Sequence, residues 1–188
     1  MINLSENDKV FLLKTARNAL NNYLKYFTES EKKRSGDESV NLLFQSGAFV
    51  TLYNKGELRG CVGQMESTET ITKLVEKMAI AASAHDHRFK SVTRKELEDI
   101  CIEISILTPK RKIDTIEEFD PAKHGIYIIK GNQSGTFLPQ VAKETGWDKE
   151  ELLGRCSRDK AGLGWDEWEN ADLYVYEVIN FSEDDFDS

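Results

Sequence analysis

The chain has 188 residues, of which 25 are lysine or arginine and 33 are aspartate or glutamate, so its formal net charge is −8. This length suits a single domain, with two lobes, that buries a sizeable core. The negative charge argues against a nucleic-acid partner, and the absence of an apolar run of roughly 20 residues argues against a membrane-spanning segment.

The first predicted element is an amphipathic helix from Ser5 to about Thr28, because apolar residues such as Leu13 and Leu20 recur at three- and four-residue steps. Ser5 and Asp8 have the spacing of a capping box. Residues 28–39 are rich in Glu, Lys and Ser and lack any period. They predict an exposed linker.

A β-hairpin is predicted next, with strands at 48–53 and 57–62 and a three-residue loop that places Gly56 in the left-handed conformation. Ser67 or Thr68 is expected to cap the helix that follows. Residues 100–106 alternate isoleucine with less apolar residues, which predicts a half-buried strand that stops before Pro109.

The second half repeats this order. Residues 125–129 and 134–138 predict another hairpin, Asp148 and Glu151 cap a helix, and residues 172–181 alternate as a closing strand. Residues 182–188 form an acidic tail, which we expect to be frayed.

The two halves therefore predict an α+β fold, a two-lobed single domain whose antiparallel sheets come from two β-hairpin–helix–strand repeats with flanking helices. An internal duplication would set residues 58–63 of one half opposite residues 135–140 of the other. The cleft between the lobes is then the natural place for a site.

Residues 58–63, with the sequence LRGCVG, are the most informative segment. Two glycines in one strand suggest a β-bulge or a close approach by another backbone. Regular alternation would put Arg59 and Cys61 on the same face, where the guanidinium would raise the thiolate fraction of Cys61. The alternative is that Cys61 is a small buried residue beside a surface arginine.

A second cluster lies at residues 85–89, where the preceding helix ends. Arg88 offers a planar fork to a carboxylate or phosphate. A histidine near Cys61 would be a general base, but we favour the interpretation that His85 and His87 only complement the helix dipole. Their His-x-His spacing has no companion cluster, so we predict no metal site.

A third cluster is found at residues 135–141, where Thr136 is expected to cap a helix that starts near Pro139 and Gln140 would present its amide to a ligand. Lys160 precedes two tryptophans, Trp165 and Trp168, which would line either the core or the cleft. The three cysteines are far apart and form no Cys-x-x-Cys pair, which favours reduced thiols and a cytoplasmic location.

Four segments in this order, residues 58–63, 86–89, 135–141 and 160–163, make the chain similar to the AMMECR-type domain family, also called AmmeMemoRadiSam system protein A. The resemblance runs from about Ser5 to Phe181. It implies one compact two-lobed α+β domain with a cleft, here residues 1–188. It also implies that a Memo-like protein and a radical S-adenosylmethionine protein are partners.

One departure from the family pattern is informative, because His87 stands where relatives commonly carry proline. A histidine at this position cannot be a base that the family shares. Asp86 and Arg88 are the residues of this segment whose role the resemblance carries over.

Two classes of function remain open, and the sequence does not decide whether the chain is an enzyme. In the first, Cys61 supplies a thiolate and a small anionic ligand binds in the cleft, at Arg59, Gly60, Gly63, Asp86, Arg88, Gln140 and Lys160. In the second, the chain is a non-catalytic adapter that docks one of the implied partners. A purely structural motif is the third interpretation, and the sequence specifies no cofactor.

Overall fold

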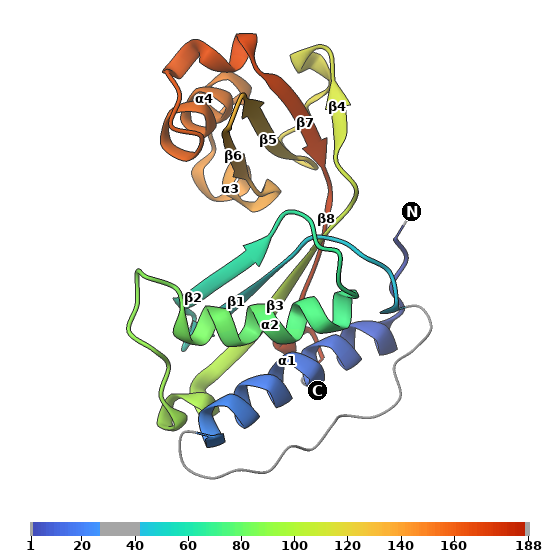
Figure 1. Ribbon diagram of the computed structural model, residues 1–188, viewed down its shortest axis with the longest axis vertical. Helices are drawn as coiled ribbons and strands as arrows, with labels where there is room; N and C mark the ends of the chain where they lie inside the picture. Colours follow the sequence, from blue (N-terminus) through green and yellow to red (C-terminus); the bar gives the residue numbers. More distant parts are fainter. Residues whose placement is uncertain (1, 27–41, 187–188) are drawn as a thin grey trace. The chain divides into compact units, whose positions relative to one another are not determined.

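The computed structural model describes residues 2–26 and 42–186 (Figure 1). These residues form two compact units: unit 1 runs up to Ile106 and resumes at Ile179, whereas unit 2 is Leu107–Val178. Within the described ranges, no helix combines the length and the apolar composition that crossing a bilayer requires. The predicted linker at residues 28–39 lies outside the described residues.

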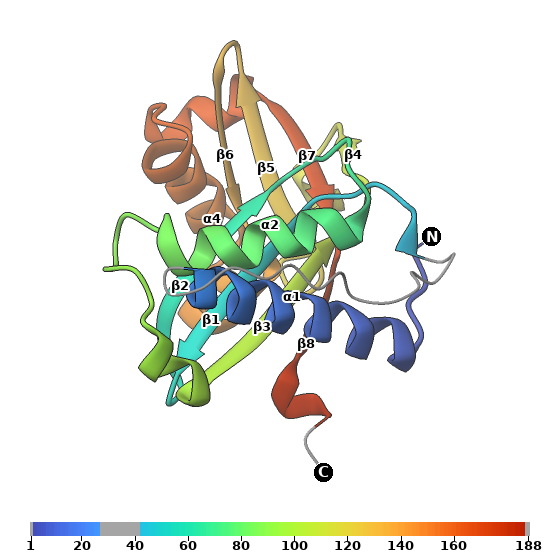
Figure 2. The same ribbon diagram turned by 60° about the horizontal axis from the view of Figure 1, so that its bottom comes forward.

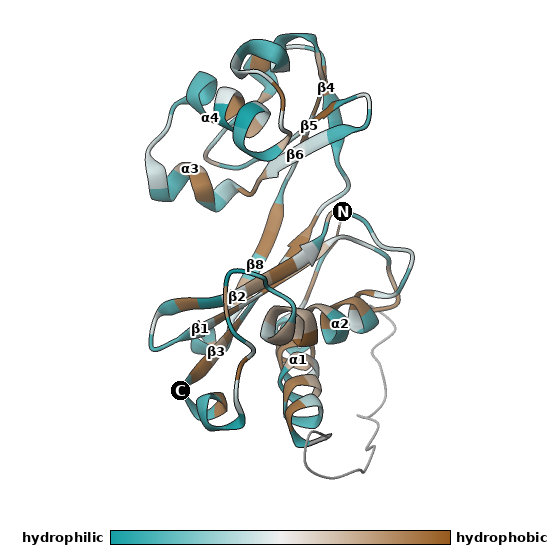
Figure 3. Ribbon diagram, turned by 60° about the vertical axis from the view of Figure 1, so that its left-hand side comes forward, coloured by the Kyte–Doolittle hydropathy of each residue, from teal (hydrophilic) through white to brown (hydrophobic). Residues whose placement is uncertain are grey.

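Unit 1 contains a sheet of four strands in the order β2-β1-β3-β8. The elements along the chain are the helices α1 (Glu6–Tyr26) and α2 (Ile71–Ala84), the 3-10 helices η2 (Arg94–Asp99) and η6 (Glu183–Asp185), and the strands β1 (Ala48–Asn54), β2 (Glu57–Gln64), β3 (Ile100–Leu107) and β8 (Val178–Ser182). Both helices lie on one side of the sheet, as Figure 3 shows, and they pack against each other (Figure 2).

The alternation of β1 and β3 decides which side of this sheet forms the core. Val50 and Leu52 of β1, together with Ile102 and Ile104 of β3, are completely buried and join one cluster with the apolar residues of α1 and α2. The predicted strand of alternating isoleucines is thereby confirmed. The intervening residues of β1, such as Thr51 and Tyr53, lie on the opposite face.

The start of α1 has the predicted capping box. The Asp8 N–H donates to the Ser5 hydroxyl at 3.2 Å, and the Ser5 N–H donates to the Asp8 carboxylate at 3.0 Å. Two free N–H groups of the helix end are satisfied in this way.

The first hairpin turn is shorter than predicted. Asn54 pairs with Glu57, so the turn has two residues, Lys55 and Gly56, with φ of 52° and 84°. A two-residue turn with positive φ at both positions matches the right-handed twist of the flanking strands. The predicted three-residue loop would not need this match.

Unit 2 contains a second sheet of four strands, in the order β4-β7-β5-β6. Its elements are the strands β4 (Arg111–Ile113), β5 (Gly125–Lys130), β6 (Gln133–Phe137) and β7 (Asp172–Tyr176), the 3-10 helices η3 (Ile116–Glu118) and η5 (Trp165–Asn170), the helices α3 (Pro139–Thr145) and α4 (Lys149–Arg155), and the π-helix η4 (Cys156–Lys160). Its core contains Ile126, Ile128, Leu153 and Val175.

The two sheets repeat one topology, which confirms the predicted α+β fold of hairpin–helix–strand repeats. In each sheet the second strand of the hairpin lies at the edge, the first strand comes next, and the strand that follows the helices is third. The hairpin pairs are antiparallel in both units.

Of the other three predicted helix caps, two are wrong and one is confirmed. Thr70 precedes α2, in place of Ser67 or Thr68, and its side chain makes no capping bond. Thr136 caps nothing, because β6 runs through it and its hydroxyl donates to the Ile126 carbonyl. Asp148 does cap α4 and accepts from the Glu151 N–H at 2.9 Å.

The predicted closing strand at 172–181 is two strands, β7 and β8, which belong to different sheets. The break falls at Glu177, whose backbone pairs with Thr108 rather than with either sheet.

The acidic tail also differs from the expected frayed end, since Glu183–Asp185 form η6 and Glu183 binds Arg17. Residues 187 and 188 lie outside the described residues.

Candidate functional site

The LRGCVG segment forms most of β2, the edge strand of the sheet in unit 1. Its register against β1 contains a β-bulge: Leu52 faces Gly60 and Tyr53 faces Leu58, so that Arg59 is the additional residue. A bulge shifts the alternation by one residue. Cys61 therefore shares its face with Leu58, which regular alternation places on the opposite face, and Arg59 is not among the charged groups that act on the Cys61 thiol.

Both glycines of the motif stand where another group approaches closely. A Cβ on Gly60 would clash with the carbonyl oxygen of Ala82 near the end of α2, and a Cβ on Gly63 would clash with the Phe49 ring. The predicted close backbone approach is confirmed at Gly60. These contacts fill the space beside the glycines with the protein's own atoms, and a ligand role for Gly60 and Gly63 stays a prediction.

Cys61 is half-buried, and the Thr51 hydroxyl lies 3.3 Å from its sulfur as a hydrogen-bond donor. Burial raises the pKa of the Cys61 thiol, and the charges of Asp86 and Glu103 act in the same direction. The Thr51 hydrogen bond and the Arg88 guanidinium oppose this rise without cancelling it. The thiol is thus protonated at neutral pH, and the cation that acts on it is Arg88 rather than Arg59.

Asp86 connects the loop after α2 to β2. Its carboxylate is buried and accepts from the Cys61 N–H at 2.9 Å, from the Arg88 N–H at 3.1 Å, and from the Arg88 guanidinium through Nε at 2.9 Å and Nη2 at 2.7 Å. These bonds, the Arg88 side chain first, hold the pKa of Asp86 well below its usual range. Asp86 is therefore a permanent anion with its acceptor sites occupied.

Arg88 is the more accessible member of this pair, with 48% of its side chain exposed against 4% for Asp86. The carbon centre of its guanidinium lies 5.3 Å from the centroid of the Phe89 ring. Its Nε and Nη2 point to Asp86, which leaves the Nη1 edge for an outside acceptor, since no described residue accepts from it. Among the charged groups of this cluster, Arg88 is the one that suits contact with another molecule.

Arg59 is held by a different set of partners. Its Nε donates to Glu96 at 2.8 Å, and Nη1 and Nη2 donate to the carbonyl oxygens of Lys90 and Ser91 at 2.8 and 3.3 Å. The Glu96 carboxylate also caps η2 by accepting from Thr93, and the hydrogen bond from Arg59 is the main reason that its pKa falls to about 2. Arg59 fastens the loop after α2 onto β2, so little of it remains for a ligand.

The remaining predicted residues are dispersed. His85 and His87 are exposed and do not belong to the groups that act on Cys61, in agreement with their interpretation as residues of a helix end. Gln140 and Lys160 belong to unit 2, in the first turn of α3 and at the end of η4. The exposed Lys160 ammonium lies 5.5 Å from the centroid of the Phe137 ring. Convergence of Gln140 and Lys160 with Cys61 stays a prediction.

Three site residues escaped sequence reasoning. Thr51 of β1 lies between Cys61 of β2 and Glu103 of β3 in the sheet. These neighbours are set by the register of the three strands, and no local sequence motif indicates it. Glu96 could have been found, because Thr93 and Glu96 have the spacing of a capping box. The structure thus brings together Thr51, Cys61, Asp86 and Arg88. Arg59 of β2 and Glu96 of η2 form a separate pair.

Comparison with known proteins gives consistent matches along both units. A family model described as AMMECR1 matches residues 13–181. Protein MK0488 of Methanopyrus kandleri is 37% identical over an alignment of 186 positions that covers 93% of this chain and 88% of that protein. Protein PH0010 of Pyrococcus horikoshii is 38% identical over an alignment of 176 positions that covers 88% of this chain and 84% of that protein. The crystal structure of uncharacterized protein PH0010 superposes with a TM-score of 0.83 at 34% identity, covering 92% of this chain and 90% of that chain.

Proposed function

Because this chain belongs to the AMMECR1 family, we propose that it is a non-catalytic binding module, an adapter that docks a partner protein next to the LRGCVG motif. The observation that carries the proposal is that the polar groups of the motif are bound by residues of the loop after α2 and of η2. Asp86 and Arg59 are used within the chain, and Cys61 is a protonated, half-buried thiol. The motif then serves to hold an edge strand and a loop in a fixed shape.

The groups that point outward from this frame suit protein contact. Leu58 is 39% exposed, one of the large apolar side chains that the described residues leave open, and it lies on the same face as Cys61. Arg88 adds a guanidinium edge. Arginine is enriched among the side chains that anchor interfaces, and covering an exposed apolar side chain removes apolar surface from water. The partner surface should therefore carry a carboxylate for Arg88 and an apolar side chain for Leu58. The Memo-like protein and the radical S-adenosylmethionine protein are the partners to test first.

The test is a binding measurement between the full chain and each of these two proteins from the same cell. Leu58→Ala and Arg88→Ala should each weaken binding at least tenfold, whereas Cys61→Ser should leave it unchanged. Lys73→Ala, an exposed position on α2, is the matched control. If neither protein binds, or if both variants bind as the wild type does, the adapter proposal is wrong.

A thiol-dependent enzyme acting on a small anionic ligand is the second candidate. It is favoured by one observation, namely that Arg88 acts on the Cys61 thiol in the direction that lowers its pKa. The rate of iodoacetamide labelling against pH separates the two candidates. Because burial raises the pKa of Cys61, we expect slow labelling at neutral pH. A labelling midpoint near or below pH 7 would establish a reactive thiolate and favour the enzyme. Loss of the cellular function in Cys61→Ser, with partner binding intact, would also support the enzyme.

A further inference from the structure

The main-chain groups of β2 that point away from β1 are only partly covered. β2 is the edge strand of the sheet in unit 1, so one of its sides has no neighbouring strand. In an antiparallel pair, the N–H and C=O of successive residues point alternately toward the paired strand and away from it. The register is regular beyond the bulge, and the Cys61 N–H points outward to Asp86. The N–H and C=O of Gly63, two residues further on, therefore point outward as well.

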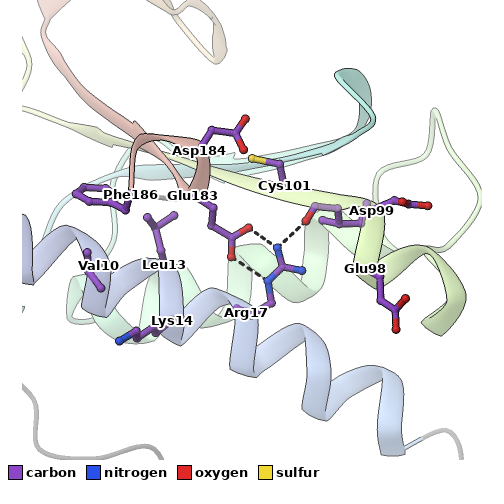
Figure 4. Close-up of a pocket in the computed structure, with 11 residues that line it drawn as sticks. Val10, Leu13, Lys14, Arg17, Glu98, Asp99, Cys101, Glu183, Asp184 and Phe186 are labelled. Atoms are coloured by element: carbon purple, nitrogen blue, oxygen red, sulfur yellow. Dashed lines mark hydrogen bonds and ion pairs between the residues drawn. The ribbon is translucent and has the colours of Figure 1, made fainter. Parts of the chain in front are cut away.

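Elsewhere in unit 1, the chain covers strand N–H groups with its own carboxylates. Asp86 accepts from the Cys61 N–H at 2.9 Å, and Glu183 accepts from the Ile102 N–H of β3 at 2.9 Å. Figure 4 shows Glu183 among the side chains that line a cavity beside α1. Each of these carboxylates thus supplies the acceptor that a strand N–H would otherwise lack.

Three outward main-chain groups of β2 have no such cover. They are the carbonyl of Cys61 and the N–H and carbonyl of Gly63, with which no residue in the described ranges forms a hydrogen bond. Along the strand these groups follow the order acceptor, donor, acceptor. The backbone of an extended segment from another chain matches this order, because strands pair through such rows of main-chain groups.

We propose that the partner protein docks by strand addition, so that an extended segment of the partner pairs with β2 at residues 61–63 and enlarges the sheet of unit 1. This inference rests on the proposed adapter function and adds the mode of binding. Oδ2 of Asp86 accepts from both the Cys61 N–H and the Arg88 Nη2, so the guanidinium lies beside this edge. Charge complementarity with Arg88 then requires an acidic side chain in the added segment.

Hydrogen exchange at the Gly63 amide tests this mode of binding. The rates are measured residue by residue by NMR, for the full chain alone and with the Memo-like protein or the radical S-adenosylmethionine protein bound. In the complex, the Gly63 N–H should exchange roughly tenfold more slowly or slower still, because strand pairing gives it an acceptor. The amides of β5, in unit 2, should keep their rates.

Gly63→Pro and Gly63→Ala form a matched pair for a second test. Both add a Cβ beside the Phe49 ring, but only proline also removes the outward N–H. Gly63→Pro should therefore weaken partner binding at least tenfold more than Gly63→Ala does. If either variant fails to fold, the exchange rates of the wild-type chain decide the question.

The outcomes separate strand addition from the adapter function. A Gly63 amide that stays unprotected in a complex weakened by Leu58→Ala and Arg88→Ala would overturn strand addition and leave the adapter function intact. Equal binding of the two Gly63 variants would also overturn it. If neither protein binds, both proposals are wrong. Protection of Gly63 that rises with the concentration of the free chain would assign the edge to a second copy of this chain, against the proposal.

Discussion

At the scale of single residues, Asp86 holds the motif together. Its carboxylate accepts from the Cys61 N–H and from Arg88. Because β2 is an edge strand, the outward N–H of Cys61 has no neighbouring strand to pair with. Unpaired groups at a sheet edge invite pairing with other chains. Asp86 therefore covers part of the edge and at the same time orients Arg88.

Replacement of this carboxylate should destabilise the fold. Asp86→Asn is expected to lower the free energy of unfolding by about 1–3 kcal/mol, because the amide loses the charge-assisted bonds to Arg88 and cannot accept as many donors. Urea denaturation followed by circular dichroism measures the change. Asp99→Asn is the control, since that carboxylate is 47% exposed and pairs with an exposed lysine; an equal loss in both variants would contradict the role of Asp86.

Glu96 should contribute to the pH dependence of stability. Its folded-state pKa is about 2, below the ordinary value of 4.5, with the Arg59 hydrogen bond as the main cause. A depressed carboxylate pKa stabilises the fold above the unfolded-state value, and this stabilisation disappears as the pH falls from about 4.5 through 2. Glu96→Gln should therefore cost about 1 kcal/mol at pH 7 and flatten the decline of the melting temperature over that acidic range. An unchanged slope would disprove the ion pair with Arg59.

At the scale of elements, the bulge in β2 decides which side chains meet. Arg59, the additional residue of the bulge, binds the loop after α2, and Cys61 lies beside Thr51. The glycine after the bulge then lets α2 approach β2, because Gly60 faces the Ala82 carbonyl. The packing of α2 against β2 thus depends on the absence of a side chain at Gly60.

An alanine at Gly60 should push α2 away from the strand. The added Cβ would meet backbone rather than the end of a flexible side chain, so we expect Gly60→Ala to cost about 1–3 kcal/mol in the free energy of unfolding. Gly135→Ala should behave alike in unit 2, where β6 faces the backbone of Lys160 and Ala161. Stability equal to that of the wild type in chemical denaturation, for either variant, would show that the helical segment can shift without cost.

At the scale of the whole molecule, each unit uses the same strand order, and unit 1 joins the two ends of the chain. The Glu183 carboxylate accepts from Arg17 of α1 and from the Ile102 N–H of β3 at 2.9 Å. The acidic C-terminal segment is therefore an integral part of unit 1 rather than a solubilising tail. Its ion pair is only about one-quarter exposed, with 25% of Arg17 and 21% of Glu183 accessible.

Removal of this connection should loosen unit 1 selectively. Glu183→Ala is expected to lower its stability by about 1–3 kcal/mol, because Arg17 and the Ile102 N–H lose their acceptor. Hydrogen exchange should increase in α1 and β3 and stay unchanged in β5 and β7. The control is Glu169→Ala at an exposed position of η5. Uniform acceleration across both units would mean that the ion pair has no local effect.

The sequence alone was sufficient for most of the fold. Periodicity located α1, the two hairpins and β3, because the apolar pattern of each depends only on near neighbours in the chain. The same reasoning located the capping residues Ser5 and Asp8, as well as Asp148. The repeat of hairpin, helix and strand followed from the order of these elements, and the resemblance to the family came from four short segments that keep their order.

Only the tertiary structure decided the chemistry of the site. Regular alternation places Arg59 beside Cys61, but a bulge is set by the partner strand and cannot be read from one strand alone. The pKa of Cys61 depends on burial and on Asp86 and Glu103, which are remote in sequence. The acidic C-terminus likewise has no local pattern that predicts its ion pair with Arg17. Local periodicity determines where the helices and strands lie. Long-range packing determines which charges lie near a side chain and whether its polar atoms remain available to a ligand.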